Sequence, residues 1–160
     1  MKKIFLFVLL LTVFVQQINS QCTNCTNTYT NATINTSFSI SGVICFSGTT
    51  NTIQGDISSI DDGSVICVGP GTTLNLNSNN YNVGATNNIT VNVYGTLKFN
   101  TNPNLAGRWT FNIYSGGVLN YGSLGFIAAS GKLTINNAGT FSGGKLEITG
   151  NNSTGSITNT

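Results

Sequence analysis

Few side chains in this sequence are suited to acid–base or metal chemistry. The 160 residues contain no histidine and four acidic residues. Asp61 and Asp62 are adjacent, so on a strand they would point to opposite faces, whereas the two carboxylates of a glycosidase lie about 5–9.5 Å apart across the sugar. The preference of Asp and Gly for turns explains the stretch SIDDGS without a cation bound between Asp56, Asp61 and Asp62. We therefore predict a protein that is not an enzyme and that has no metal or other cofactor.

Aromatic side chains are better candidates for a binding site, because their rings stack on the faces of sugars. Tyr94 and Tyr114 close two similar segments, VNVY and FNIY, and we expect them near one corner of the fold. Trp109 and Tyr121 complete the set of candidate glycan-stacking residues. Corner tyrosines also serve as ordinary packing residues, so both interpretations stay open. Threonine-rich runs such as TNTYTNATINT do not recur at a fixed spacing, so we expect no regular threonine array.

The segment from Met1 to Ser20 has the organisation of a secretory signal peptide. Two lysines precede an apolar run from Ile4 to Val15, and a short polar stretch ends at Ser20. The apolar run is shorter than the roughly 20 residues that a spanning helix needs. We expect cleavage after Ser20, and hence an exported protein that begins at Gln21 and does not span a membrane.

Removal of this leader leaves four cationic and four acidic side chains, and therefore a net charge of zero. That balance excludes the basic surface of a nucleic-acid binder, so no nucleic-acid partner is expected. Most of the polarity comes instead from Asn, Thr and Ser. The remaining charged residues are Lys98, Arg108, Lys132 and Lys145 against Asp56, Asp61, Asp62 and Glu147.

From Ile89 onward, apolar and polar residues recur with a period of about 22 residues, which is in the range of solenoid repeats. Within each repeat they alternate, as in a strand that buries one face. Glycines at the same spacing mark the corners between short strands. The recurring apolar columns are Val91, Ile113, Ile135 and Ile157; Ile89, Phe111 and Leu133; and Leu97, Leu119 and Phe141.

A repeat of this length with three bends makes one turn of a parallel β-helix, whose turns pair with one another at about 4.8 Å. β-Branched, aromatic and glycine residues dominate the repeats, which excludes a helical repeat. We predict an all-β fold, a right-handed parallel β-helix or β-solenoid, over residues 41–160. Residues 21–40 are expected to form an N-terminal cap, with one strand from Asn31 that points Ile34, Thr36, Phe38 and Ile40 inward. We expect the solenoid to be truncated at its C-terminal end and to stack there on further repeats or a partner.

The four cysteines are expected to form disulfides, because an exported protein meets an oxidising environment. The triplet VIC occurs twice, one repeat apart, and carries Cys45 and Cys67. These two would lie one strand spacing apart, within the Cα separation of about 4.4–6.8 Å that a disulfide requires. Three pairings are possible. We favour Cys45 with Cys67, and Cys22 with Cys25 as a structural clasp rather than a redox pair.

Three stretches of the chain resemble the start of large secreted surface proteins of Bacteroidetes, which are adhesin-like and often exported by the type IX system. They are SGVICFSG, DDGSVICVGPGTTLNLN and ITVNVYGTLKFN, and they follow a signal peptide and a Cys-x-x-Cys. The resemblance covers most of the mature chain. It implies a cell-surface location, but it supplies no catalytic or ligand-binding residues, because the shared motifs are structural.

Together these features predict a non-catalytic, secreted structural or adhesive β-solenoid module of a bacterial cell-surface protein. Its partners would be host or environmental glycans or other surface proteins. The alternative is a carbohydrate-binding module that uses Tyr94, Tyr114 and Trp109. A β-helix polysaccharide lyase, in which Arg108 would bind a sugar acid, is a more remote alternative.

Overall fold

The computed structural model describes residues 21–78, 80–122, 126–129, 131–148 and 154–160. The predicted signal peptide at residues 1–20 lies outside the described residues. Within them every regular element is a β-strand. No helix in this part of the chain is long and apolar enough to cross a bilayer.

The strands form three parallel sheets, and the chain visits each sheet once in every turn. The first sheet contains β1 (Asn27–Thr30), β4 (Val43–Ser47), β7 (Val65–Val68), β10 (Asn88–Val93), β13 (Arg108–Ile113), β16 (Lys132–Asn137) and β19 (Thr154–Asn159). The second contains β2 (Thr33–Ile34), β5 (Thr50–Ile53), β8 (Thr73–Leu76), β11 (Thr96–Phe99), β14 (Val118–Asn120) and β17 (Thr140–Ser142). The third contains β3 (Phe38–Ile40), β6 (Ile57–Ile60), β9 (Asn80–Val83), β12 (Asn104–Leu105), β15 (Phe126–Ala129) and β18 (Lys145–Ile148).

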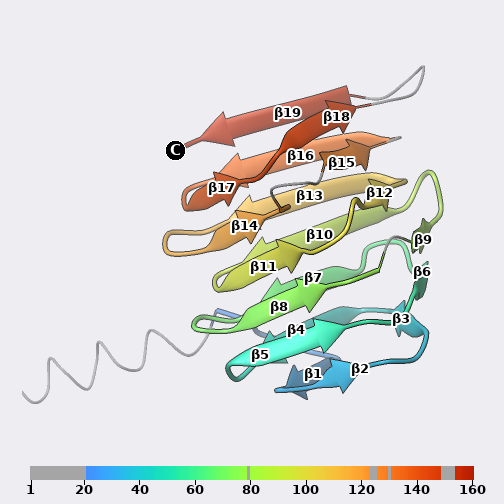
Figure 1. Cartoon of the computed structure of the whole chain (residues 1–160), viewed down its shortest axis with the longest axis vertical. Coiled ribbons are helices and arrows are strands. Elements are labelled where there is room, and N and C mark those ends of the chain that lie inside the picture. The colour runs from blue at the N-terminus through green and yellow to red at the C-terminus, as the bar shows by residue number, and fades with distance from the viewer. Residues whose placement is uncertain (1–20, 79, 123–125, 130, 149–153) are drawn as a thin grey trace, which may run out of the picture.

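Each strand pairs in parallel with the strand three places later, so successive turns lie on top of one another from β1 to β19 (Figure 1). The pairs Val43 with Val65 and Val65 with Thr90 show that the length of a turn varies by a few positions. Corner loops of different length account for the variation. The predicted parallel β-solenoid, with about 22 residues per turn, is therefore confirmed.

The β13 turn departs from the regular spacing. Val91 pairs with Phe111 at a sequence separation of 20, and Phe111 pairs with Ile135 at a separation of 24. The outward asparagines of the same three strands are hydrogen-bonded at the same two separations. The predicted column is therefore wrong at Ile113, which lies beside Val93 instead. The displacement is by two positions, and side chains alternate between the two faces of a strand, so the predicted buried face is still buried.

The second sheet keeps the predicted column without displacement. Leu97 pairs with Leu119, and Leu119 pairs with Phe141, at the predicted spacing in both cases. Leu97 and Leu119 are buried, and Phe141 packs partly buried against the same core. The sequence register is thus reliable where the corner loops keep a constant length.

Inward side chains of all three sheets meet in one continuous apolar core. The largest fully buried side chains include Phe46, Phe99 and Phe111. Full burial of one such side chain stabilises the fold by about 1.5–3 kcal/mol. The stacked core, rather than any one turn, therefore holds the coil together.

The expected single cap strand is instead a complete solenoid turn. Residues 27–40 form β1, β2 and β3, so Ile34 and Phe38 belong to different sheets. The Tyr29 ring packs against Phe38 and Phe46, with ring centroids 5.4 and 5.6 Å apart. One aromatic ring thus covers the core on the β1 side.

Glycine allows the corner between the first and second sheets to be tight. Gly95, Gly117 and Gly139 occupy equivalent places in successive turns, since the N–H of Val118 donates to the Gly95 carbonyl and that of Thr140 to the Gly117 carbonyl. A Cβ atom at Gly117 would overlap the carbonyl oxygen of Val93. Only a residue without a side chain lets the two backbones approach so closely.

Candidate functional site: the outer face of the first sheet

The outer face of the first sheet carries the side chains that are best placed to contact a partner. Side chains alternate along β10, β13 and β16, with apolar residues inside and polar residues outside. Parallel pairing places equivalent outward residues in columns that run up the coil. We call the outward side chains of these three strands and of the residue that follows each strand the open face. They are Asn88, Thr90, Asn92 and Tyr94; Arg108, Thr110, Asn112 and Tyr114; and Lys132, Thr134, Asn136 and Ala138.

Asparagines form a hydrogen-bonded ladder along the middle of the open face. The Nδ2 group of Asn112 donates to Oδ1 of Asn92 over 2.9 Å, and Nδ2 of Asn136 donates to Oδ1 of Asn112 over 2.8 Å. Each amide has two donor hydrogens and two acceptor lone pairs, so each retains hydrogen-bonding capacity for solvent or a ligand. The ladder is therefore both a support for the turns and an uncharged polar surface.

Threonines form a second column beside the ladder. Thr90 pairs with Thr110, and Thr110 pairs with Thr134. All three are partly exposed. The prediction that threonines form no regular array is therefore wrong. The threonine-rich stretch near the N-terminus does not form the column, but single threonines of three successive turns do.

Tyr94 and Tyr114 lie at one end of the open face, stacked on each other. Their ring centroids are 4.1 Å apart and the ring planes are nearly parallel, at 12°. Tyr94 is half-buried, and burial, followed by the Tyr114 hydroxyl, raises its pKa to about 12. Tyr114 remains 38% exposed. The two candidate stacking residues are thus together at the surface.

The other two aromatic candidates are buried. Trp109 is 2% exposed, stacks on Phe111 at 5.8 Å, and donates its Nε1 hydrogen to the Ala106 carbonyl. Tyr121 is also buried and stacks on Phe141 at 5.1 Å. The prediction that Trp109 stacks on a glycan is wrong, because Arg108 points outward on β13 and the next residue must point inward.

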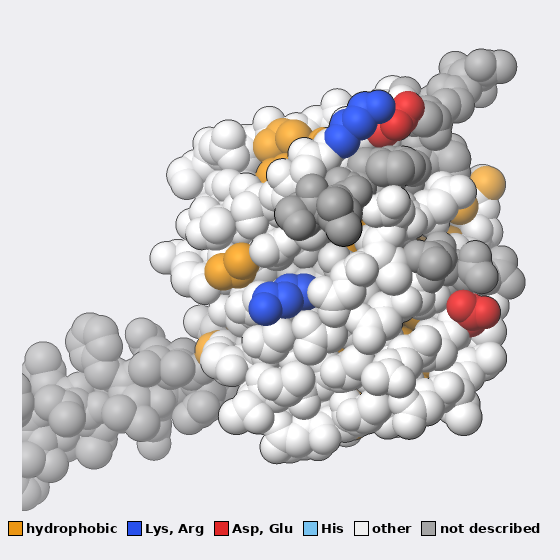
Figure 2. Space-filling model, in the orientation of Figure 1, with side chains coloured by type: hydrophobic (Ala, Val, Ile, Leu, Met, Phe, Trp, Pro, Cys, Tyr) orange, Lys and Arg blue, Asp and Glu red, His pale blue; other side chains and the backbone are white. Residues whose placement is uncertain are grey.

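Charged side chains lie at the opposite end of the open face from the tyrosines. Arg108 and Lys132 are exposed neighbours on adjacent strands, and neither forms an ion pair within the described residues. On the face drawn in Figure 2, charged side chains are few, and most of the visible surface is uncharged. The pair is therefore a local concentration of positive charge on a largely neutral protein.

Asp62 lies near this end of the face and belongs to the predicted Asp-Asp-Gly turn. Its Oδ1 atom accepts hydrogen bonds from the backbone and side-chain nitrogens of Asn88, at 2.6 and 3.0 Å. These bonds, with a smaller contribution from Arg108, lower the pKa of Asp62. The described residues contain no group of three His, Cys, Asp or Glu side chains that could hold a metal ion.

The disulfides join the N-terminal segment to two successive turns. Cys22 is bonded to Cys67 and Cys25 to Cys45, with Cα separations of 5.8 and 5.7 Å. All four cysteines are paired, as predicted, but the favoured pairing is wrong. Asn24, at a φ of 59°, lies in the turn between Cys22 and Cys25.

The register explains why the neighbouring cysteines do not bond to each other. Cys45 and Cys67 are directly paired on β4 and β7, as predicted. Side chains of such a pair run parallel, about 4.8 Å apart, whereas bonded cysteines need Cβ atoms about 3.8 Å apart. Both side chains point out of the sheet, so each meets a cysteine of the segment that crosses over them. Two disulfides are consistent with an extracellular protein.

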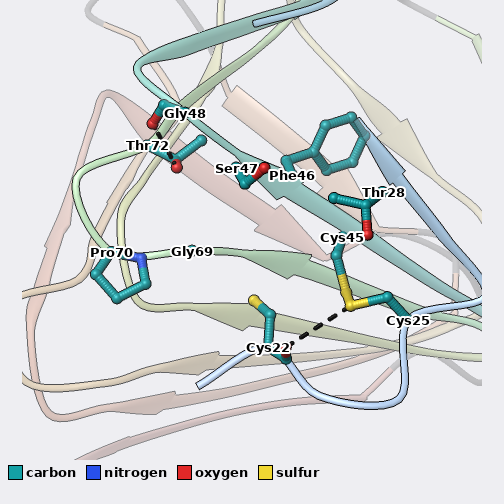
Figure 3. A pocket seen from close by; sticks show the side chains of 10 residues that line it. All are labelled: Cys22, Cys25, Thr28, Cys45, Phe46, Ser47, Gly48, Gly69, Pro70 and Thr72. Carbon is teal, nitrogen blue, oxygen red and sulfur yellow. Dashed lines mark hydrogen bonds between the residues drawn. A yellow bond between two sulfur atoms is a disulfide. The ribbon is translucent and has the colours of Figure 1, made fainter. Parts of the chain in front are cut away.

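A shallow cleft of about 320 Å³ lies beside this crossing segment (Figure 3). Figure 3 shows the Cys25–Cys45 bond on one side and the corner with Pro70 on the other. The hydroxyl of Thr72 donates to the Gly48 carbonyl at this corner. The residues that line the cleft are Cys22, Cys25, Thr28, Cys45, Phe46, Ser47, Gly48, Gly69, Pro70 and Thr72.

The Asn and Thr columns were not predicted, nor was the position of Arg108 and Lys132 beside them. The signal is present in three segments, TVNVY at 90–94, TFNIY at 110–114 and TINNA at 134–138. These segments are unequally spaced, so a uniform period places Asn112 in the threonine column. Comparison with known proteins found no matching family model, no matching curated protein and no matching solved structure.

Proposed function

We propose that this protein is an exported, non-catalytic β-solenoid that acts as a stiff structural and adhesive module of a bacterial surface protein. The continuous stacking of its turns is the observation that carries the proposal. Three parallel sheets run through successive turns around one core. A coil of this kind resists bending and presents few loose segments to proteases.

Two further features support an extracellular structural role. The disulfides fasten the first residues of the described chain to the second and third turns, at Cys45 and Cys67. The outer surface carries mostly Asn, Thr and Ser, whose side chains stack in columns without the repulsion of like charges. The resemblance of the VIC-containing segments to adhesin-like surface proteins of Bacteroidetes agrees with this role.

Limited proteolysis of the purified exported protein tests the structural role. We expect the oxidised protein to survive trypsin and a broad-specificity protease for hours with a start at Gln21, as measured by intact mass. The adhesive role is tested separately: beads coated with the protein should adhere to surfaces coated with a glycan or a surface protein that it binds, and uncoated beads should not. Rapid cleavage throughout residues 41–148 of the oxidised protein would contradict the proposal.

Carbohydrate binding is the second candidate, because Tyr94 and Tyr114 form a stacked aromatic pair at the surface. Exposed tyrosine rings present an apolar face and a polar edge, which suits sugars. Binding of a defined glycan that is lost in Tyr94→Ala and Tyr114→Ala would support this candidate. Unchanged binding in both variants would assign the pair to packing between turns.

A further inference from the structure

We infer that the open face of the first sheet binds an anionic polysaccharide, with Arg108 and Lys132 at one end of the bound chain and Tyr114 at the other. The inference rests on the proposed function, since it names the partner of an adhesive surface. The buried Trp109 is not part of this site, whereas Arg108, Lys132 and Tyr114 all lie on the open face.

The N-terminal segment marks where the face begins. Cys45 and Cys67 occupy the same outward column as Asn92, which follows them on β10. On β4 and β7 that column is covered by the disulfide-bonded segment, whereas from β10 onward it carries the asparagine ladder. The sheet is therefore accessible over β10, β13 and β16.

Charge at the basic end selects an anionic partner. Arg108 and Lys132 lie one strand spacing apart, both exposed, and neither pairs with a carboxylate in the described residues. Asp62 lies near this end, next to Asp61, and its Oδ1 atom accepts two hydrogen bonds from Asn88. Arg108 and Lys132 are the outward side chains of adjacent strands at this end, so they are the charges that a ligand lying along the open face meets. Guanidinium groups bind carboxylates and sulfates through paired hydrogen bonds.

The opposite end offers a ring for a sugar to stack on. One face of Tyr114 is covered by Tyr94, and the next residue up the column is Ala138, whose side chain is a single methyl group. The other face of Tyr114 is therefore accessible, in agreement with its 38% exposure. Arg108 and Tyr114 are six positions apart, which at about 3.3 Å per residue is roughly 20 Å, enough for several sugar rings.

Between the two ends the face offers uncharged hydrogen-bonding groups. Asn112 and Asn136 have donors and acceptors beyond those used in the ladder, and Thr110 and Thr134 add partly exposed hydroxyls. Such groups match sugar hydroxyls. Two cations on a protein of zero net mature charge are too few for a nucleic acid, whose affinity depends on many phosphate contacts. A polysaccharide fits the length, polarity and charge of the face better.

A matched pair of polymers tests the inference. Polygalacturonate and its fully methyl-esterified form share one backbone and differ in charge. We expect the exported protein to bind immobilised polygalacturonate, and to bind the ester at least about tenfold more weakly. Dextran sulfate and dextran form a second pair that separates recognition of charge from recognition of the galacturonate ring.

Surface variants then locate the site. Arg108→Gln combined with Lys132→Gln should lower affinity for polygalacturonate about fivefold or more, and Tyr114→Ala should lower it by a similar factor. Lys98→Gln is the matched control, because Lys98 is an exposed cation on β11 of the second sheet and should bind as the wild type does. Thermal unfolding of each variant shows that the fold is retained.

Several outcomes would overturn the inference. Equal binding of the acid and ester forms would show that charge is not recognised. A loss in Lys98→Gln equal to that in the double variant would show that binding is a general charge effect. Absence of binding to both polygalacturonate and dextran sulfate would show that the face does not recognise anionic polysaccharides. In each case protease resistance would still report on the structural role separately.

Discussion

The outward column of the first sheet is closed on one part of the coil and open on the next. On β4 and β7 it holds Cys45 and Cys67, which are bonded to a segment that lies over them. From β10 it holds asparagines that bond to one another and face solvent. The core beneath is continuous in both regions. The same structural position can therefore hold a disulfide or a solvent-facing amide, because the core places no demand on outward side chains.

Removal of either disulfide, which holds the N-terminal segment over β4 and β7, should have the largest effect on stability. Each of the double variants Cys22→Ser/Cys67→Ser and Cys25→Ser/Cys45→Ser should lower the free energy of unfolding by about 3–4 kcal/mol, because loops with sequence separations of 45 and 20 are released. Urea unfolding measures the change. Peptide mapping under non-reducing conditions checks the pairing, and a peptide that links Cys22 to Cys25 would contradict it.

The open region has no disulfide in its described residues, so its stability depends on close packing. Gly117→Ala should destabilise the protein by about 2–3 kcal/mol, because the added methyl group overlaps the Val93 carbonyl oxygen. Gly116→Ala is the control. Nothing lies within 4 Å of its Cβ position, and its φ of 82° should cost only about 1 kcal/mol. Equal losses in the two variants, measured by thermal unfolding, would show that backbone approach at the corner is unimportant.

Loss of the asparagine ladder should lower the free energy of unfolding by a smaller amount. Asn112→Ala removes two amide hydrogen bonds, one from Asn112 itself and one from Asn136, and should cost about 1 kcal/mol because both partners stay accessible to water. Thr110→Ala, two positions earlier on the same strand, is the matched control and should change stability less. A larger loss in Thr110→Ala, by urea unfolding, would assign the support to the threonine column.

Protonation of Asp62 should have the smallest effect on the stability of the fold. Its pKa is lowered in the folded protein, so the stability that it contributes is present above the ordinary pKa of about 4 and is lost as pH falls through the folded value. We expect the melting temperature of the wild type to fall more than that of Asp62→Asn as the pH is lowered below about 4. Parallel curves for the two proteins would show that the bonds to Asn88 do not stabilise the fold.

Two of the errors in the sequence predictions have a common physical origin. A uniform period describes the average turn, but corner loops around β13 shift that strand by two positions. The shift leaves the buried face unchanged and moves every outward residue to a neighbouring column. Phe111 therefore stayed in the predicted core, whereas the Asn and Thr columns were not recognised. Trp109 was wrongly predicted at the surface for a different reason. It follows the outward Arg108 on the same strand and therefore points inward, but the prediction did not consider which face of the strand it lies on.

The recurrence of the same pattern about every 22 residues, with glycines between the short strands, determined the parallel solenoid, and the alternation of apolar and polar residues determined its buried face. The alternation is a local property, since each strand buries one side regardless of which residue lies beside it. The disulfide partners and the make-up of the open face were decided only by the tertiary structure. They depend on the lengths of the corner loops and on the path of the N-terminal segment across β4 and β7, which bring together residues that no local pattern relates.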